Sequence, residues 1–357
     1  MRVLFIIGCL EGESKRYRVD NYREYLSLAG LEPASVYEID IPARLRWVYS
    51  FDVIVFFRAA YSPVLEQLLT EGRRRSTPLV FDVDDLVIDP GAVEHVKAIR
   101  TWPAGRHAEY VDGVRRYGAT LERCDYVTVP TQYLADYIQR TTGKRTFVLR
   151  NGLNSTQMAL SAQALANRPP SEYVTIGYFS GTDTHSADFA QVVEPLVRIM
   201  GDFPQTRLLI VGYLDVPEPL RVFGARVETM GRVDWRQLPT VIARADINLA
   251  PLETGNPYCE SKSELKYYEA ALVGVPTVAS PTDAFRWAIR HGENGFLANT
   301  AAEWCDALAQ LVGNSEQRSA VAEKARSHAL STYTPETMSL RALAMYQILA
   351  RHRPPGR

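Results

Sequence analysis

Three charged residues in the second half of the chain, Lys262, Lys266 and Glu269, have types and spacing that could bind a nucleotide. Side chains at i, i+4 and i+7 share one face of a helix, and both lysines would lie near its positive N-terminal end. Two ammonium groups beside helix-end amides suit a diphosphate, while the carboxylate could accept hydrogen bonds from ribose hydroxyls. The pattern indicates a site for a nucleotide diphosphate sugar. The alternative is an exposed, salt-bridged helix face, which is the usual fate of such triples.

The residues around this triple predict the local structure that would position it. Residues 256–278 are typical of a loop, a helix that stops at Gly274 and a strand. Ser261 and Glu264 have the spacing of a capping box, in which each side chain satisfies a free backbone N–H of the first turn. We therefore expect Glu264 to be structural.

A cluster of carboxylates, Asp82, Asp84 and Asp85, ends an apolar run in the first half of the chain. Neighbouring carboxylates repel one another and require a cation, a proton or a hydroxylated ligand. A divalent cation is one candidate, because hard cations prefer carboxylate oxygens. We favour a second interpretation, in which Asp84 or Asp85 orients or deprotonates a substrate hydroxyl. Capping of the next turn would account for one carboxylate and not for three.

The loop that begins at Gly8, in the first half of the chain, could also contact a bound anion. Arg16 or Arg18 could neutralise a phosphate or an acidic substrate, although a solvated helix start explains them equally well. The loop lacks GxGxxG spacing, and no Gly-Lys-Ser/Thr occurs in the chain. Dinucleotide-binding and P-loop hypotheses therefore lose most of their support.

Short apolar runs separated by amphipathic stretches are typical of parallel sheets covered by helices on both faces. This alternation occurs twice, so we predict an α/β fold of two doubly wound, Rossmann-like domains that face a central cleft. The predicted strands are 3–7, 53–57, 79–81, 126–129 and 147–149, followed by 174–179, 208–211, 227–230, 247–250 and 277–279. The predicted divisions are an acceptor-side domain 1–158, a linker 159–172, a donor-side domain 173–335, and a C-terminal helix and tail 336–357.

Composition and charge narrow the class of protein. The chain has 357 residues and a formal net charge of −1, so it lacks the basic field that nucleic-acid binders use. The apolar N-terminal run is shorter than a signal peptide or a membrane span, and we expect a cytoplasmic protein. The basic clusters 73–75 and 144–145 could touch anionic lipid at the inner face of a membrane, with exposed loop charge as the alternative.

The segment from Glu260 to Ser280 resembles the donor-site signature of group 1 (GT4-like) glycosyltransferases of the GT-B fold, two glutamates eight positions apart followed by a Gly-x-Pro strand. Glu269 matches the second glutamate, which in the family contacts the ribose. Ser261 stands at the first glutamate position, and Glu260 lies one residue out of register. The resemblance also covers 177–182, which adds Gly181 and Thr182 as donor-site candidates.

The resemblance implies further properties of the site. The loop glycine Gly12 would approach the donor phosphates from the opposite wall, and catalysis would retain anomeric configuration without a metal or another cofactor. Family members usually place an Arg and a Lys after the first strand of the second domain, where this chain has residues 183–185. Lys262 and Lys266 would then carry more of the phosphate charge.

The expected function is transfer of a sugar from a nucleotide diphosphate sugar to a hydroxyl of a glycan or lipid-linked acceptor, as in polysaccharide biosynthesis. One alternative is a GT-B epimerase that acts on a sugar nucleotide. Another is a non-catalytic domain that binds sugar nucleotides or glycans, which the absent Arg-Lys pair and Ser261 favour.

Overall fold

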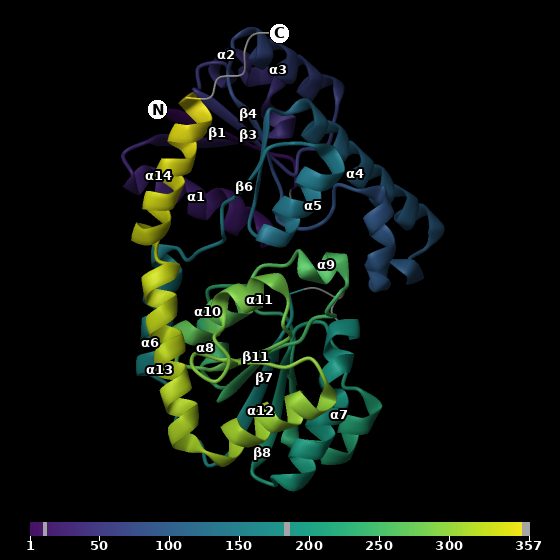
Figure 1. The fold of residues 1–357 in the computed structure, drawn as a ribbon, viewed down its shortest axis with the longest axis vertical. Helices are drawn as coiled ribbons and strands as arrows, with labels where there is room; N and C mark the ends of the chain where they lie inside the picture. The colour runs from purple at the N-terminus through teal and green to yellow at the C-terminus, as the bar shows by residue number, and fades with distance from the viewer. Residues whose placement is uncertain (10–12, 182–185, 352–357) are drawn as a thin grey trace.

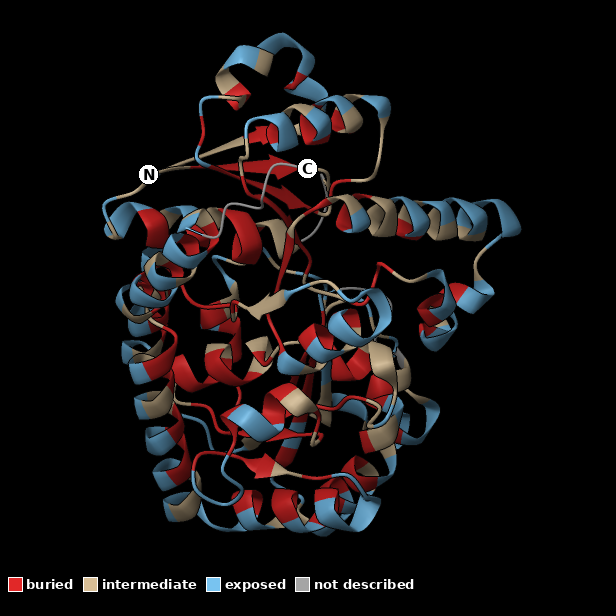
Figure 2. Cartoon of the chain, turned by 45° about the horizontal axis from the view of Figure 1, so that its top comes forward, coloured by how far each residue is buried: buried red, intermediate tan, exposed pale blue. Residues whose placement is uncertain are grey.

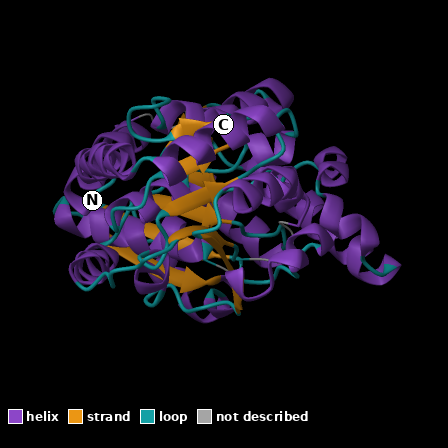
Figure 3. Ribbon diagram, turned by 90° about the horizontal axis from the view of Figure 1, so that it is seen from below, coloured by secondary structure: helices purple, strands orange, loops and turns teal. Residues whose placement is uncertain are grey.

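The computed structural model describes residues 1–9, 13–181 and 186–351, which form two α/β units stacked along the long axis of the molecule (Figure 1). Each unit is built on a six-stranded sheet in which every neighbouring pair is parallel. Seen along this axis, helices flank the strands on both sides (Figure 3). The predicted α/β architecture of two doubly wound domains is therefore confirmed.

The first sheet has the strand order β2-β1-β3-β4-β5-β6. Its strands are β1 (Arg2–Ile7), β2 (Glu32–Tyr37), β3 (Val53–Phe57), β4 (Leu79–Asp82), β5 (Tyr126–Val129) and β6 (Thr146–Val148). Its helices are α1 (Asn21–Leu28), α2 (Leu45–Val48), α3 (Pro63–Arg74), α4 (Ala104–Arg123) and α5 (Gln132–Thr142), with a π-helical turn η1 (Arg16–Asp20) before α1. Strand β3 is buried at all of its positions, as strands covered on both faces must be.

The second sheet has the strand order β12-β11-β10-β7-β8-β9. Its strands are β7 (Val174–Phe179), β8 (Thr206–Val211), β9 (Val227–Met230), β10 (Ile247–Ala250), β11 (Thr277–Ala279) and β12 (Phe296–Leu297). The helices of this half are α6 (Ser155–Ala166), α7 (Ser186–Asp202), α8 (Leu238–Ile242), α9 (Pro257–Glu260), α10 (Leu265–Leu272), α11 (Asp283–Ala288), α12 (Ala301–Gly313) and α13 (Ser315–Thr332).

Two strands, β2 and β12, were absent from the sequence prediction, and both lie at sheet edges. Strand β2 is mostly half-exposed, so it has no continuous apolar run, and β12 has only two residues. Edge strands pack on fewer neighbours than central ones, which weakens the hydrophobic signal.

The predicted linker 159–172 is largely helical. Helix α6 is capped by Asn154, whose side chain accepts a hydrogen bond from the N–H of Gln157 (2.7 Å), and it packs on α8 and α10. Only residues 167–173 lead to β7 without helix or strand. The prediction rested on the lack of strand periodicity in this segment. A capped helix lacks that periodicity just as a linker does, so the pattern could not distinguish the two.

The last helix, α14 (Pro335–Arg351), returns to the first half of the chain. It packs along α1, beside which it runs in Figure 1, and Met338 and Tyr346 join the core formed by β1 and β3. Its buried face points inward and its exposed face outward (Figure 2). The C-terminal helix therefore ties the two units together.

Both sheets reverse their winding direction at one point, between β1 and β3 in the first and between β7 and β10 in the second. Ligands of open α/β sheets bind outside the carboxyl ends of the strands at such points. The topology therefore predicts where each half contributes to a site.

Candidate functional site

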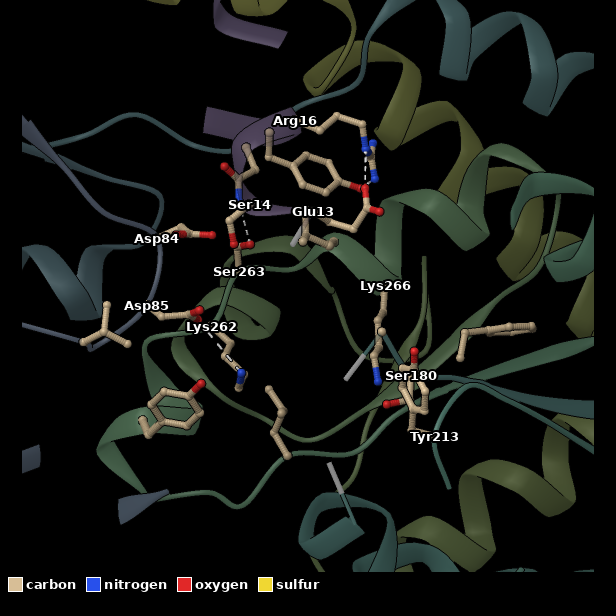
Figure 4. A pocket seen from close by; sticks show the side chains of 18 of the residues that line it. Glu13, Ser14, Arg16, Asp84, Asp85, Ser180, Tyr213, Lys262, Ser263 and Lys266 are labelled. Atoms are coloured by element: carbon tan, nitrogen blue, oxygen red, sulfur yellow. Dashed lines mark hydrogen bonds and ion pairs between the residues drawn. The ribbon is translucent and has the colours of Figure 1, made fainter. Parts of the chain in front are cut away.

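A cavity of about 1060 Å³ lies between the two halves and reaches both reversal points. Arg58 follows β3, and Ser180 and Pro251 follow β7 and β10; all three line it. Figure 4 shows charged side chains from both walls projecting into this space. The cavity is therefore shared between the halves, as a two-substrate site requires.

The local structure around the lysines differs from the prediction. Residues 257–272 form two short helices, α9 and α10, in place of one. Ser261 and Glu264 form no capping box: the Ser261 hydroxyl donates to the carbonyl of Tyr258 (2.7 Å). The Glu264 carboxylate accepts from the Tyr333 hydroxyl (3.0 Å) and lies 3.6 Å from Arg150. These partners come from distant parts of the chain, so a local motif could not reveal them.

Lys262, Lys266 and Glu269 nevertheless all line the cavity. The side chain of Asn248, a polar residue within β10, donates to the carbonyl of Lys266 (3.0 Å) and thereby fixes the start of α10 on the sheet. The Lys266 ammonium lies 4.3 Å from the centre of the Tyr178 ring. In Figure 4 it points toward Ser180.

The two lysines have different electrostatic surroundings. Burial lowers the pKa of Lys266 to about 8, because desolvation disfavours the charged ammonium. Burial acts in the same direction on Lys262, but Tyr258 and Asp85 outweigh it and raise the pKa of Lys262. The Lys262 ammonium lies 3.9 Å from the Asp85 carboxylate and 4.4 Å from the centre of the Tyr258 ring. Both ammonium groups can meet an anion in the cavity.

Glu269 connects the second half of the chain to the first half. Its Oε1 accepts hydrogen bonds from the Tyr17 hydroxyl and from Nε2 of Gln157 (2.8 Å), and it lies 3.8 Å from Arg16. Burial raises the pKa of Glu269. Arg16 lines the cavity but donates to Glu13 (2.9 Å), so its charge is already paired.

The carboxylates of Asp84 and Asp85 are held by Arg58. Its Nε donates to Asp84 (2.7 Å) and its Nη2 to Asp85 (2.6 Å). Arg58 has a left-handed backbone with φ of +41°. A Cβ on Gly8 would lie 2.4 Å from the Arg58 carbonyl oxygen and 2.3 Å from Cα of Ala59, so glycine permits this close approach. Burial raises the pKa of Asp84, which Arg58 only partly opposes.

The third carboxylate of the cluster, Asp82, is structural. Nε and Nη2 of the fully buried Arg18 donate to its two oxygens (2.9 and 2.6 Å), and the Thr128 hydroxyl donates to Oδ2 (2.6 Å). Arg18 also donates to the side chain of Asn151 (3.0 Å), which lines the cavity. Arg18 is thus a core residue rather than a phosphate ligand.

The remaining predicted residues divide into three groups. Gly181 lines the cavity. Gly12 and Thr182 lie outside the described residues. Glu260 and Ser261 do not line the cavity. The Glu260 carboxylate accepts from the N–H of Gly255 (2.9 Å) and from that of Asp283 at the start of α11 (3.0 Å), and Ser261 is fully buried.

Several lining residues were absent from the sequence prediction. The sequence around Arg58 contains no motif that marks it as a site residue, apart from its position directly after a buried strand. One face of α4, formed by Tyr110, Gly113, Val114 and Tyr117, could have been found from its i, i+3, i+4 and i+7 spacing. On the donor side the cavity has an apolar section formed by Tyr213, Val233, Trp235, Leu238 and Ile242.

Within the described ranges, no group of three or more His, Cys, Asp or Glu side chains is arranged to hold a metal ion. None of the helices in those ranges combines the length and the apolar character needed to cross a membrane.

Comparison with known proteins agrees with this geometry. Residues 172–314 match the family described as Glycosyl transferases group 1. The chain is 29% identical over 205 residues to phosphatidyl-myo-inositol mannosyltransferase of Mycobacterium leprae, over 56% of this chain and 53% of that protein. The Mycobacterium tuberculosis protein of the same name is 28% identical over 150 residues, 41% of this chain and 38% of that protein. The chain thus spans about half, or less, of the curated relatives that it matches.

Two solved structures share the fold over nearly the whole chain. Sucrose-phosphate synthase of Thermosynechococcus elongatus has a TM-score of 0.65 and 17% identity, covering 98% of both chains. Anabaena HepE in complex with UDP and glucose has a TM-score of 0.67 and 16% identity, covering 98% of this chain and all of the other. At such identities the likeness concerns the fold.

The fold is that of GT-B glycosyltransferases. Within its second half, residues 172–314 match the Glycosyl transferases group 1 family, which is the family that the resemblance of residues 260–280 indicated.

Proposed function

We propose that this protein transfers a sugar from a nucleotide diphosphate sugar to a hydroxyl of a glycan or lipid-linked acceptor. The observation that carries the proposal is the pair Lys262 and Lys266 on the donor-side wall, with Asp84 and Asp85 across the same cavity. Among the relatives, HepE is described with UDP-glucose and the curated proteins are named mannosyltransferases. These names support a nucleotide sugar as donor.

The donor would lie along the second half of the chain. Lys262 and Lys266 would bind the diphosphate, and their charge would stabilise it as the bond to the anomeric carbon breaks. Glu269 would accept a hydrogen bond from a ribose hydroxyl, and the apolar section around Trp235 would hold the base. With two ammonium groups on the phosphates, the reaction needs no metal ion to neutralise the leaving group.

The acceptor would lie along the first half. The acceptor oxygen forms the new bond to the anomeric carbon on the face that the diphosphate leaves, which retains configuration. The hydroxyl proton passes to Asp84 or Asp85 or to the departing phosphate. Arg58 holds both carboxylates in place for this role.

A calorimetric screen of the purified protein against UDP, GDP, dTDP, CMP and NAD tests the donor site. We expect one nucleoside diphosphate to bind and NAD not to bind. Incubation with the matching nucleotide sugar, with and without acceptors, then separates transfer from epimerisation, since an epimerase changes the sugar with no acceptor present. Binding of NAD, or of none of these compounds, would contradict the proposal.

Asn substitution at Asp84 and at Asp85, made singly, is expected to lower kcat by about 100-fold for at least one variant, which is typical when a general base is lost. Donor affinity should change little for Asp84→Asn, whereas Asp85→Asn also removes a carboxylate 3.9 Å from the Lys262 ammonium and is expected to change donor affinity as well. Steady-state kinetics with saturating donor measure the effect. Asp112→Asn is the matched control, because Asp112 is exposed on α4 and, among the residues that the structure describes, forms an ion pair only with Arg115. Wild-type rates in both test variants would assign the pair a structural role.

A further inference from the structure

The two walls of the cavity carry opposite charge. Among the described residues, the second half contributes three cations and one carboxylate: Arg232, Lys262, Lys266 and Glu269. The first half contributes four carboxylates and two guanidinium groups: Glu13, Asp84, Asp85, Glu109, Arg16 and Arg58. Two of these charges pair across the cavity, since Arg232 donates to Glu13 (3.2 Å) and the Lys262 ammonium lies 3.9 Å from Asp85. The net charge still differs in sign between the walls, so an anion is favoured at the second-half wall over the first.

The two guanidinium groups of the first wall are engaged by acids of the protein. Arg58 donates to both Asp84 and Asp85 (2.7 and 2.6 Å). Arg16 donates to Glu13 (2.9 Å) and lies 3.8 Å from Glu269. A phosphate on this wall would have to compete with these carboxylates for each guanidinium.

The rest of the first wall is apolar and largely aromatic. Tyr110, Val114 and Tyr117 project from one face of α4, and the rings of Trp102 and Tyr110 meet edge to face with their centres 5.7 Å apart. Val96 and Ile99 line the cavity beside them. Tyr side chains combine an apolar ring with a polar hydroxyl, so they can pack on a sugar ring and hydrogen-bond its edge.

This aromatic face leads directly to the reacting carboxylates. Tyr110, Asp85, Arg58 and Lys262 all line the same cavity. A sugar ring packed on the α4 face can therefore present a hydroxyl to Asp85 while its C–H face covers the tyrosine rings.

We propose that the acceptor is an uncharged sugar, bound by its apolar face along Tyr110, Val114 and Tyr117 of α4, with no phosphate on the ring that accepts. The inference rests on the proposed glycosyl transfer and deepens it by naming the chemical class of the acceptor. Carboxylates accept hydrogen bonds from neutral hydroxyls and repel phosphate. They therefore favour an uncharged sugar over a sugar phosphate as acceptor.

Substitution of Gly113 tests whether the acceptor binds on this face of α4. Gly113 lines the cavity between Tyr110 and Tyr117, and a Cβ built there meets nothing within 4 Å. Gly105 near the start of the same helix is equally open but does not line the cavity. Both positions can accept a larger side chain without a clash, and glycine in a helix is unfavourable, so neither substitution should unfold the protein.

The acceptor class is tested with paired probes that carry either an uncharged alkyl group or a phosphate at C1 of the same sugar. Octyl glucoside and octyl mannoside are compared with glucose 1-phosphate and mannose 1-phosphate, using the nucleotide sugar that the binding screen identifies. Release of nucleoside diphosphate and the mass of the product are measured. We expect transfer to at least one octyl glycoside, with kcat/KM at least about tenfold above that for the matching sugar phosphate.

The location is tested with Gly113→Phe and its control Gly105→Phe. We expect Gly113→Phe to lower kcat/KM for the octyl glycoside by about tenfold or more, with donor affinity and melting temperature unchanged. Gly105→Phe should retain wild-type transfer. Preference for the sugar phosphates, equal effects of the two substitutions, or no transfer to any octyl glycoside would each overturn the inference. In the last case, donor binding would still be measurable, so failure here is distinguishable from failure of the proposed donor site.

Discussion

Replacing Lys266 with methionine is expected to weaken binding of the nucleoside diphosphate by about 100-fold, equivalent to the ~2–3 kcal/mol of a charge-assisted hydrogen bond. The same change should raise the melting temperature of the free protein. The ammonium is buried over the ring of Tyr178, and methionine keeps much of the side chain's volume without the cost of burying a charge. Calorimetry and thermal unfolding measure the two effects on one preparation.

The pH dependence distinguishes this residue from an ordinary surface lysine. The pKa of Lys266 is lowered from 10.5 to about 8 in the folded protein, and a bound phosphate favours the protonated form. Donor affinity should therefore be constant below about pH 7 and fall as the pH rises through 8. Between pH 8 and 10.5 the unfolded chain binds more protons at this lysine than the folded one, so its destabilising effect disappears as pH rises through that window.

Lys324→Met is the matched control, because Lys324 lies exposed on α13. It should leave donor affinity unchanged. Identical behaviour of the two variants would show that Lys266 does not bind the phosphate.

Replacing Arg18 with methionine is expected to destabilise the protein by about 3–5 kcal/mol, because it leaves the Asp82 carboxylate buried without its partner. Arg18 is 1% exposed and Asp82 3% exposed, so water cannot replace the lost interaction. The free energy of unfolding is measured by urea denaturation.

The double variant Arg18→Met with Asp82→Leu should recover much of the loss, since it removes both charges. Arg115→Met, which breaks an exposed pair with Asp112, should cost less than about 1 kcal/mol. Equal stability of the Arg18 variant and the wild type would show that the buried pair contributes little.

The sequence predicted the central strands of both sheets because each is an apolar run buried on both faces. It also predicted that Lys262, Lys266 and Glu269 face one cavity, although Lys262 lies in the segment between α9 and α10 and not on the helix that carries the other two. The capping box was wrong because Glu264 finds a stronger partner set in Tyr333 and Arg150, far away in the chain.

The roles of the charged residues in the first half depended on pairing that no local pattern contains. Asp82, Asp84 and Asp85 are adjacent in sequence, yet the first faces Arg18 in the core and the other two face Arg58 in the cavity. These three carboxylates point in different directions because their arginine partners lie on different sides of the end of β4.

The sequence by itself determined the fold class, the two-unit organisation and the donor-side cluster, because hydrophobic periodicity and residue spacing along one segment are local properties. Only the tertiary structure decided which carboxylates are buried, which arginines are engaged, and that the cavity lies against the aromatic face of α4. Those features depend on contacts between segments tens to hundreds of residues apart, and burial and pairing at such contacts set the charge of each wall.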